Sequence, residues 1–360
     1  MPAVGGDLVT NGAIIAGQRE PLRQQSGSVA PEIAVLIPCF NEELTIGHVI
    51  EQFRVELPHA RIYVFDNNST DGTVECARQK GALILRERRQ GKGYVVQSMF
   101  RDINADMYVM VDGDGTYPAR SVRRLLEPVL NNEADMVVGS RLNSASKSQF
   151  RLTNRLGNYI FLWLTRTIFN AHIEDMLSGY RIFNRNIVKH LPLLAGGFEI
   201  ETELTIKALE RGYRVIELPV DLASRAKGSY SKIRHFRDGL IITNMIFSLA
   251  RDYKPLTVFG TVGLLLILSG LIPGILVISE FLRTGLVPRL PSAVLAVGLE
   301  LSGLVVGMVG LVLHTVVRRF QELDLEIQHL GRQILVAQQG KHPSSGTATD
   351  EDKRSSIIAL

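Results

Sequence analysis

The sequence predicts an α/β protein in which a mostly parallel sheet, covered by helices on both faces, is followed by a hairpin of two transmembrane helices. In the first half of the chain, short apolar runs alternate with segments of helical length. Near the C-terminus, two apolar runs are each long enough to cross a bilayer. The apolar fraction of 46% excludes a chain that is disordered throughout.

The alternating part supplies five candidate strands and the helices between them. The strands are predicted at residues 33–37, 61–66, 82–87, 107–112 and 135–140, and the helices at residues 43–56, 70–80, 93–102 and 119–131. Continuous apolar strands separated by helices are typical of a parallel sheet that is buried on both faces. Such sheets bind ligands beyond the carboxyl ends of their strands, so the residues that directly follow each strand are the candidate functional residues.

Polar residues follow four of the five strands directly. They are Asn41 and Glu42 after the first strand, Asp66 to Gly72 after the second, Asp112 and Asp114 after the fourth, and Ser140 and Arg141 after the fifth. Each motif alone could be an ordinary turn or a helix cap. Together they bring carboxylates to one edge, where like charges repel unless a cation lies between them. A Mg²⁺ or Mn²⁺ ion held by Asp112 and Asp114, and itself bound to a diphosphate, is the simplest solution.

The positive charge of the chain is concentrated in one segment. The whole sequence has a net charge of +4, whereas residues 225–254 contain seven basic and two acidic residues. This pattern does not fit a nucleic-acid-binding protein dominated by basic surface, and no nucleic-acid partner is expected. We expect the segment to bind phosphate and anionic lipid at a membrane surface. Two cysteines, Cys39 and Cys76, form no disulfide framework and fit a reducing compartment.

The transmembrane helices are predicted at residues 257–278 and 294–317, within a membrane segment at residues 255–317. A pair of buried core helices is the alternative, but apolar runs of this length are uncommon in soluble domains. Basic residues flank the outer ends of the pair, so the positive-inside rule predicts that the N-terminal domain and the C-terminus are cytoplasmic. We therefore expect a multi-pass protein of the cell (inner) membrane. Glu300, inside the second helix, is expected to face a partner helix, as an oligomer contact rather than a catalytic residue.

The remaining segments have distinct patterns. They are a flexible tail without a secretory signal at residues 1–31, a juxtamembrane amphipathic helix at residues 233–254, a heptad helix at residues 318–338 and a disordered tail at residues 339–360. The heptad seam, which begins at Leu313, predicts a homo-oligomer, and packing of this helix on the protein's own N-terminal domain is the alternative. The apolar and aromatic stretch at residues 152–169 fits either a core helix or a membrane contact.

Five motifs, in their order and spacing, resemble the inverting glycosyltransferases of family 2, which have the GT-A nucleotide-sugar-binding fold. They are Pro38-x-x-Asn41-Glu42, Asp66-x-x-Ser69-x-Asp71-Gly72-Thr73, Gly91-Lys92-Gly93, Asp112-x-Asp114 and Gly139-Ser140-Arg141. Two later motifs are similar to those of the dolichyl- or polyprenyl-phosphate sugar synthases of that family, such as dolichol-phosphate mannose synthase: Asp175-x-x-Ser178-Gly179-Tyr180-Arg181 and Arg225-x-Lys227-Gly228-Ser229-x-Ser231-Lys232. The resemblance covers residues 32–254 and implies a GT-A domain at residues 32–232.

On the donor side, the resemblance implies a complete nucleotide-sugar site. The implied residues are Pro38, Asn41 and Glu42 around the base and ribose, Asp66 as a hydrogen-bond acceptor, Lys92, and Asp112 and Asp114 at the metal and the diphosphate. Asp114 is the expected direct ligand of the Mg²⁺ or Mn²⁺ ion, which would stabilise the leaving nucleoside diphosphate. Many relatives have a Gln where this chain has Thr116, so Thr116 is not included among the metal ligands.

On the acceptor side, the resemblance implies a set of cations around a lipid phosphate. Arg141 and Arg155 are implied to bind the acceptor phosphate, while Arg225, Lys227 and Lys232 are implied to close over the phosphates. Each could instead be an ordinary surface cation. Arg225 and Asp175 are included with Asp114 among the catalytic candidates, although an ionised phosphate needs no strong general base. Asp175 is therefore either a base or a residue that orients Arg141 or the sugar.

The implied function is transfer of a hexose from UDP-glucose or GDP-mannose to polyprenyl phosphate by a membrane-bound enzyme. One alternative is a processive polysaccharide synthase. The Gln-x-x-Arg-Trp pattern of such enzymes is absent, because Trp163 is the single tryptophan and Phe-Leu precedes it. Another alternative is a non-catalytic membrane scaffold, which the intact acidic motifs disfavour. The sequence leaves open the base, the sugar and the choice between an undecaprenyl and a dolichyl carrier.

Overall fold

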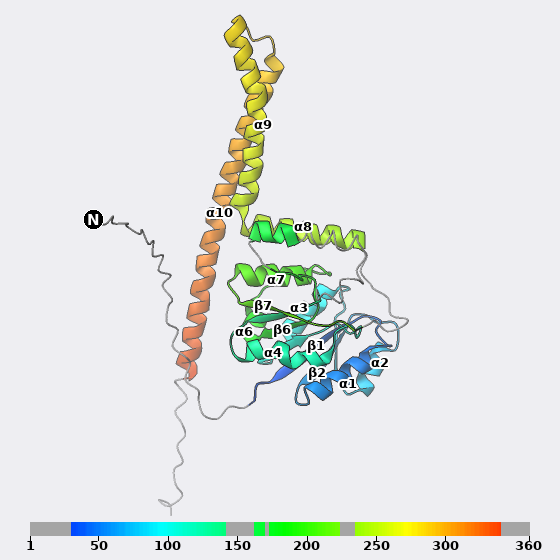
Figure 1. Ribbon diagram of the computed structural model, residues 1–360. Helices are drawn as coiled ribbons and strands as arrows, with labels where there is room; N and C mark the ends of the chain where they lie inside the picture. The colour runs from blue at the N-terminus through cyan, green and yellow to red at the C-terminus, as the bar shows by residue number, and fades with distance from the viewer. Residues whose placement is uncertain (1–29, 142–161, 170–172, 224–234, 340–360) are drawn as a thin grey trace, which may run out of the picture.

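The computed structural model of the protein describes residues 30–141, 162–169, 173–223 and 235–339 (Figure 1). The predicted tails at residues 1–31 and 339–360 lie almost entirely outside these ranges. Four of the predicted site residues also lie outside them: Arg155, Arg225, Lys227 and Lys232. Their roles therefore remain predictions from the sequence.

Seven strands form one mostly parallel sheet. They are β1 (Ile33–Cys39), β2 (Arg61–Asp66), β3 (Leu83–Arg86), β4 (Met107–Met110), β5 (Met136–Ser140), β6 (Arg181–Asn184) and β7 (Val215–Pro219). Their order is β3-β2-β1-β4-β6-β5-β7, and within this sheet β6 runs antiparallel to both of its neighbours. The five predicted strands are all present. The sequence did not predict β6 and β7, because the polar residues Arg181 and Glu217 interrupt such short apolar runs.

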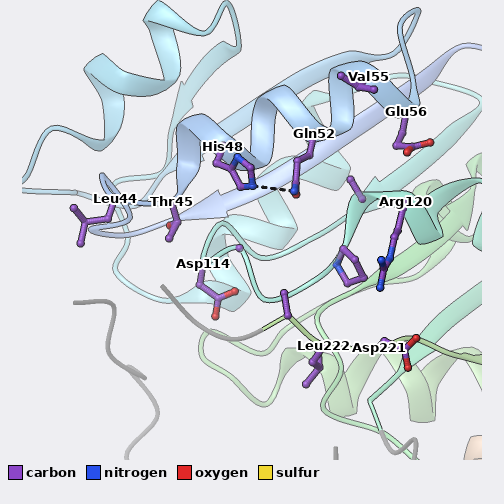
Figure 2. Close-up of a pocket in the computed structure, with 14 residues that line it drawn as sticks. Leu44, Thr45, His48, Gln52, Val55, Glu56, Asp114, Arg120, Asp221 and Leu222 are labelled. Carbon is purple, nitrogen blue, oxygen red and sulfur yellow. Dashed lines mark hydrogen bonds between the residues drawn. The ribbon is translucent and has the colours of Figure 1, made fainter. Parts of the chain in front are cut away.

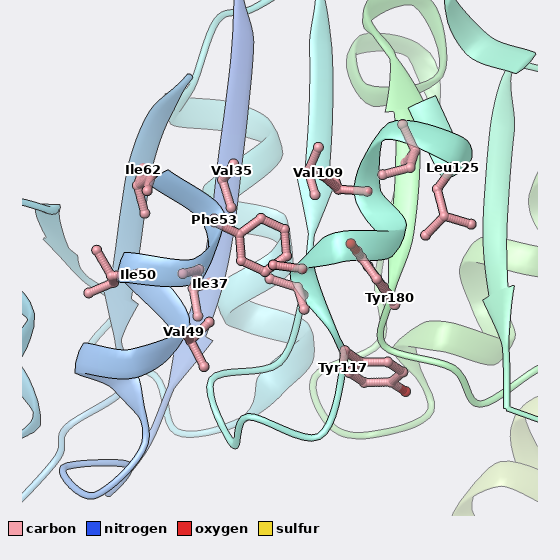
Figure 3. Close-up of a cluster of buried hydrophobic side chains, with 14 of the residues drawn as sticks. Val35, Ile37, Val49, Ile50, Phe53, Ile62, Val109, Tyr117, Leu125 and Tyr180 are labelled. Carbon is pink, nitrogen blue, oxygen red and sulfur yellow. The ribbon is translucent and has the colours of Figure 1, made fainter. Parts of the chain in front are cut away.

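Helices cover both faces of the sheet. They are α1 (Ile46–Glu56), α2 (Thr73–Gln79), α3 (Lys92–Asp102), α4 (Val122–Leu130), α6 (Arg185–His190) and α7 (Ile200–Glu210). Successive residues of a strand point to opposite faces, so Val35 and Ile37 of β1 pack with α1 and α4 (Figure 3). Ala34 and Leu36 of the same strand pack with α3, α6 and α7. The mostly parallel, doubly covered sheet predicted from the sequence is confirmed.

Helices α1 and α2 begin three residues later than predicted, and α4 begins at Val122 instead of residue 119, after a 3₁₀ turn at Ala119–Ser121. The helix after β1 begins at Ile46 instead of residue 43, and the helix after β2 begins at Thr73 instead of residue 70. In the first case Asn41 has a φ of 52°, and a turn follows in which the Ile46 N–H donates to the Glu42 carbonyl at 2.9 Å. The shortened helices leave longer loops at the carboxyl edge of the sheet, where the predicted site residues lie.

Helix α8 (His235–Tyr253) lies against α7, across the base of the C-terminal hairpin (Figure 1). Its buried side, represented by Ile246, packs with α7 and with the helical residues 162–169. Its other side exposes Leu240 and Phe247. The described part of the apolar stretch at residues 152–169 therefore contributes to a core, because Phe169 is buried there, whereas Trp163 is exposed.

The C-terminal hairpin consists of α9 (Pro255–Thr284) and α10 (Leu290–Gln339). By length and composition, α9 and residues 290–323 of α10 can each cross a membrane, and most of their apolar side chains are exposed. The two backbones approach closely, since a Cβ placed on Gly263 would lie 2.7 Å from the Gly303 carbonyl oxygen. Glu300 lies against Gly270 and Gly274 of α9, the other helix of the hairpin. Its expected contact with a partner helix in an oligomer stays a prediction.

Helix α10 is longer than the predicted transmembrane segment. The predicted helices at residues 294–317 and 318–338 form one continuous helix, which extends past the base of α9 (Figure 1). Among the described elements, α10 packs extensively on α9 and on no other. Phe320, Leu323, Ile327 and Leu330 of the heptad seam are therefore exposed.

The close approach of α9 and α10 gives a test of the hairpin. Gly303→Leu should lower the melting temperature of the detergent-solubilised protein by several degrees, because its side chain would meet the backbone at Gly263 and Ile267. Gly298→Leu is the matched control, since a Cβ at Gly298 has no neighbour within 4 Å. Equal melting temperatures for the two variants would contradict this packing.

Candidate active site

The candidate site lies at the carboxyl edge of the sheet, where the loops after β1, β2, β4 and β5 meet. Because β1 lies between β2 and β4 in the sheet, its loop is adjacent to both of theirs. A hydrogen bond of 2.7 Å from the Thr45 hydroxyl to the Gly113 carbonyl joins the start of α1 to the β4 loop. The predicted donor-side residues are thus brought together at one edge.

Reciprocal hydrogen bonds join the loops after β1 and β2. The Asn41 N–H donates to the Ser69 hydroxyl at 3.0 Å, and the Asn41 carboxamide oxygen accepts from the Thr70 N–H at 2.8 Å. The Glu42 N–H donates to the Thr73 hydroxyl at 2.8 Å. Asp66 is buried and accepts a hydrogen bond from the Ser69 N–H at 3.0 Å, so one of its carboxylate oxygens stabilises the loop after β2.

Asn67 is a site residue that the sequence analysis did not select. It is buried, and its amide group donates to the carbonyls of Glu87 and Arg89 at 3.0 and 2.8 Å. Its oxygen accepts from the Gly91 N–H at 2.8 Å. Asn67 therefore fixes the loop that leads into α3 and to Lys92. Its place after Asp66 in the second motif was a signal that could have identified it.

Lys92 lies between two carboxylates. Its ammonium nitrogen is 2.5 Å from an Asp112 oxygen and 2.5 Å from a Glu201 oxygen. Burial alone would lower the pKa of Lys92, but the two carboxylates raise it above its ordinary value, so the ammonium stays charged. The other Asp112 oxygen lies against Gly179, where a Cβ would overlap the carboxylate. Lys92 and Asp112 were predicted from the sequence, whereas Glu201, which belongs to α7, was not.

Asp114 is oriented by its own loop. One Asp114 oxygen accepts from the Thr116 N–H at 3.0 Å and from the Thr116 hydroxyl at 2.7 Å. Within the described residues, no three His, Cys, Asp or Glu side chains form a metal-binding group. Mg²⁺ at phosphate sites typically uses one or two carboxylates and completes its shell with phosphate and water. Asp112 and Asp114 fit such a partial ligand set.

Asp175 and Arg141 form a buried, bidentate ion pair. The Asp175 carboxylate accepts from Arg141 Nε and Nη2, each at 2.7 Å, and from the Arg141 backbone N–H at 2.9 Å. Burial alone would raise the pKa of Asp175, but Arg141 outweighs it and holds the pKa below its ordinary value. Asp175 is therefore charged, and both of its carboxylate oxygens accept hydrogen bonds from Arg141. These bonds fix the Arg141 guanidinium at the end of β5.

A buried arginine supports the loop that carries Asp175 and Gly179. Arg181 is fully buried and donates to the carbonyls of Met176 and Ser178 at 2.8 and 2.9 Å. Tyr117, from the β4 loop, accepts from the Gly179 N–H at 2.9 Å. These contacts hold the Asp175 loop against the Asp112 loop.

A cleft of about 620 Å³ reaches Asp114 along α1 (Figure 2). His48 and Gln52 of α1, joined by a hydrogen bond of 2.9 Å, lie along one wall, and Asp221 lies on the opposite side. Helix α1 covers the sheet face opposite to α7, on which α8 packs. The cleft therefore approaches Asp114 from the side of the sheet that faces away from α8. The neighbouring Ala223 N–H donates to the Thr116 carbonyl at 2.9 Å, so the last described residue before the predicted basic loop is bonded to the Asp114 loop.

Comparison with known proteins identifies the family. Residues 34–191 match the glycosyl transferase family 2 domain. Glycosyltransferase AglJ of Haloferax volcanii is 35% identical over 240 residues, which are 66% of this chain and 78% of that protein. The chain belongs to glycosyltransferase family 2. A dolichyl-phosphate hexose transferase of the same archaeon is 29% identical over 224 residues, or 62% of this chain and 96% of that protein.

Solved structures confirm the GT-A fold of this family 2 glycosyltransferase. Glucosyl-3-phosphoglycerate synthase from Mycobacterium tuberculosis, in complex with phosphoglyceric acid, aligns with a TM-score of 0.53 at 22% identity. The alignment covers 61% of this chain and 79% of that chain. A second crystal structure of that enzyme, with a TM-score of 0.50 and 19% identity, contains Mn²⁺ and UDP-glucose and covers 61% of this chain and 80% of that chain. At these identities the likeness shows the fold alone.

The Asp175–Arg141 pair should make stability depend on pH. Because the folded-state pKa of Asp175 lies below an unfolded value of about 3.9, the pair contributes stability above that pH and loses it as pH falls through the folded-state pKa. Asp175→Asn should therefore lower the free energy of unfolding by about 3 kcal/mol at neutral pH. Thermal unfolding measured from neutral to acidic pH should show the difference from wild type shrinking below about pH 4.

Asp252→Asn is the control for this experiment. Asp252 forms an exposed ion pair with Arg251, and exposed pairs contribute little to stability. Its melting temperature should match wild type at every pH. A deficit of Asp175→Asn that is independent of pH would contradict the assigned charge of Asp175.

Proposed function

We propose that the protein transfers a hexose from a nucleotide sugar, UDP-glucose or GDP-mannose, to polyprenyl phosphate, with inversion at the anomeric carbon. The observation that carries this proposal is the Arg141 guanidinium, which Asp175 fixes beside the carboxylates of the β4 loop. A fixed, charged fork is suited to an acceptor phosphate. The dolichyl-phosphate hexose transferase relative and the two apolar helices support a lipid-linked acceptor.

On the donor side, the proposed nucleoside pocket consists of Pro38, Asn41, Glu42 and Asp66, beside Lys92. Asp112 and Asp114 would hold Mg²⁺ or Mn²⁺ together with the diphosphate. When bound, the metal supplies Lewis-acid stabilisation of the negative charge on the leaving nucleoside diphosphate. The hydrogen bonds between the β1 and β2 loops support this assignment, since they give the nucleoside a pre-formed surface.

On the acceptor side, an oxygen of the lipid phosphate attacks the anomeric carbon as the bond to the diphosphate breaks. A phosphate monoester is largely ionised at neutral pH and has no proton that must be removed first. Asp175 accepts three hydrogen bonds from Arg141, which favours an orienting role over that of a base. Arg155, Arg225, Lys227 and Lys232 are proposed to bind phosphate as well, on the basis of the sequence.

The proposed membrane topology places α9 and residues 290–317 of α10 across the cell (inner) membrane. The GT-A domain, at residues 32–232, and the C-terminal part of α10 are proposed to be cytoplasmic, as the flanking basic residues indicate. The juxtamembrane segment at residues 233–254 would lie in the headgroup layer. The exposed Leu240 and Phe247 of α8 support that position.

The proposed reaction is tested in membranes supplied with polyprenyl phosphate and labelled UDP- and GDP-sugars. Asp114→Ala should abolish transfer, because it removes the expected metal ligand. Asp175→Asn should slow transfer by roughly 100-fold, since Arg141 loses the partner that orients it. Asp252→Asn, on the exposed part of α8, should transfer at the wild-type rate. Full activity of the Asp114 variant would overturn the site, and absence of metal-dependent binding of a nucleoside diphosphate to the wild type would favour a non-catalytic scaffold.

We also propose that the protein is a homo-oligomer joined through α10. The heptad positions Phe320, Leu323, Ile327 and Leu330 are more than half exposed, and among the described elements α10 packs extensively only on α9. Phe320→Glu combined with Ile327→Glu should convert the oligomer to a monomer in membrane cross-linking. Gln321→Glu, which lies outside the seam, should leave it intact. A monomeric wild type would contradict the proposal.

A further inference from the structure

Glu201 is a buried acid that no motif of the sequence identifies. It lies in the first turn of α7, and its side chain is 4% exposed. Within the described residues, its carboxylate pairs with Lys92, at 2.5 Å, and Lys92 in turn pairs with Asp112. Three charged groups from α3, α7 and the β4 loop thus form one buried cluster, which we call the lysine bridge.

Close backbone packing fixes the geometry of the lysine bridge. The Gly93 N–H donates to the Gly196 carbonyl at 3.1 Å, and a Cβ at Gly91 or Gly93 would overlap the backbone of residues 195–196. The Gln97 side chain also donates to the Ala195 carbonyl, at 2.8 Å. The first turn of α3 is therefore locked onto the segment that leads into α7. The backbones of these two segments are too close for a side chain between them. This close packing holds Lys92 and Glu201 opposite each other.

The charges of the lysine bridge do not cancel. One ammonium serves two carboxylates, so the cluster retains one negative charge. If Asp112 had Lys92 to itself, the pair would be neutral and would attract a divalent metal ion less strongly. Because the side chains of Lys92 and Glu201 are only 12% and 4% exposed, the interaction between their charges is weakly screened, whereas Asp112 is 28% exposed and can reach a ligand.

We propose that Glu201 is a positioning residue of the transfer reaction. It shares the charge of Lys92, so that Asp112 keeps negative charge for the metal, and it holds the ammonium in one place beside the diphosphate. Glu201 itself touches neither substrate nor metal in this proposal. The inference rests on the proposed function, because it assigns Glu201 to the metal-dependent binding of the donor.

The same helix contains a matched acid with a purely structural environment. Glu203 is also buried and pairs with Lys207 at 2.6 Å, and its carboxylate accepts the backbone N–H groups of Leu194 and Ala195. The structure gives it no contact with Lys92 or Asp112 among the described residues. Glu203→Gln keeps an oxygen that can accept these N–H groups, so it reproduces the loss of a buried lysine–carboxylate pair without removing a charge from the lysine bridge.

The test measures binding of UDP and of GDP, each with Mn²⁺, to the full-length protein by calorimetry. Glu201→Gln should weaken binding of the preferred diphosphate at least roughly tenfold. Glu201→Asp keeps the charge and should restore most of that affinity, whereas Glu203→Gln should bind as wild type does. Both neutral variants should lower the melting temperature. Wild-type affinity in Glu201→Gln would overturn the inference and leave Glu201 a structural residue.

A second measurement needs no substrate. The rate at which an amine reagent modifies Lys92, followed by mass spectrometry, should rise at least roughly tenfold in Glu201→Gln and stay at the wild-type value in Glu203→Gln. An unchanged rate in Glu201→Gln would overturn the inference. If the wild type binds neither diphosphate, the proposed function fails, and the labelling rate still decides whether Glu201 positions Lys92.

Discussion

The fold gathers carboxylates at one edge of the sheet, and the structure depends on cations that balance their negative charge. A parallel sheet places the ends of β1, β2 and β4 next to one another, so their acidic residues lie in a common, partly buried region. Two buried cations make this arrangement tolerable: Lys92 serves Asp112 and Glu201, and Arg141 serves Asp175. Removing either cation would leave a charge without a partner in a region of low polarity, at a cost of several kcal/mol. In the proposed reaction, the same two cations would bind the phosphate groups of the donor and the acceptor.

A strand could be predicted from the sequence where its apolar residues form a continuous run. The five predicted strands are runs of aliphatic residues that are buried on both faces, and such runs are visible without tertiary information. Strand β6 contains Arg181, which would be expected in a loop on composition alone. Its burial is possible because the carbonyls of Met176 and Ser178 and the Thr205 hydroxyl accept from its guanidinium. Only the assembled fold supplies these acceptors, so local patterns could not predict this strand.

In the candidate site, too, some residues could be predicted from the sequence and others only from the assembled fold. Residues at strand ends, such as Asp112 and Asp114, could be predicted because a parallel sheet gives the position after a strand a functional meaning. Glu201 could not, because it is one of three alternating acids at the start of α7 that resemble a solvated helix face. The burial of Glu201 and Glu203 follows from the packing of α7 between the sheet and α8, a contact between distant segments. From the sequence, Asp175 could be either a general base or an orienting residue. Its three hydrogen bonds from Arg141, which only the structure shows, favour the orienting role.

The layers of the fold separate the two sides from which substrates could reach the site. The cleft along α1 reaches Asp114 from the sheet face that α1 and α4 cover, whereas α8 and the apolar hairpin lie beyond α7 on the other face. In the proposed reaction, a water-soluble donor and a membrane-bound acceptor would therefore approach from different directions. Inversion requires the nucleophile and the leaving diphosphate to lie on opposite sides of the anomeric carbon. With the metal–diphosphate at Asp114, after β4, and the acceptor phosphate at Arg141, after β5, the two groups would lie on either side of β6. The sheet edge itself would then impose that opposition, and neither substrate would have to pass the other.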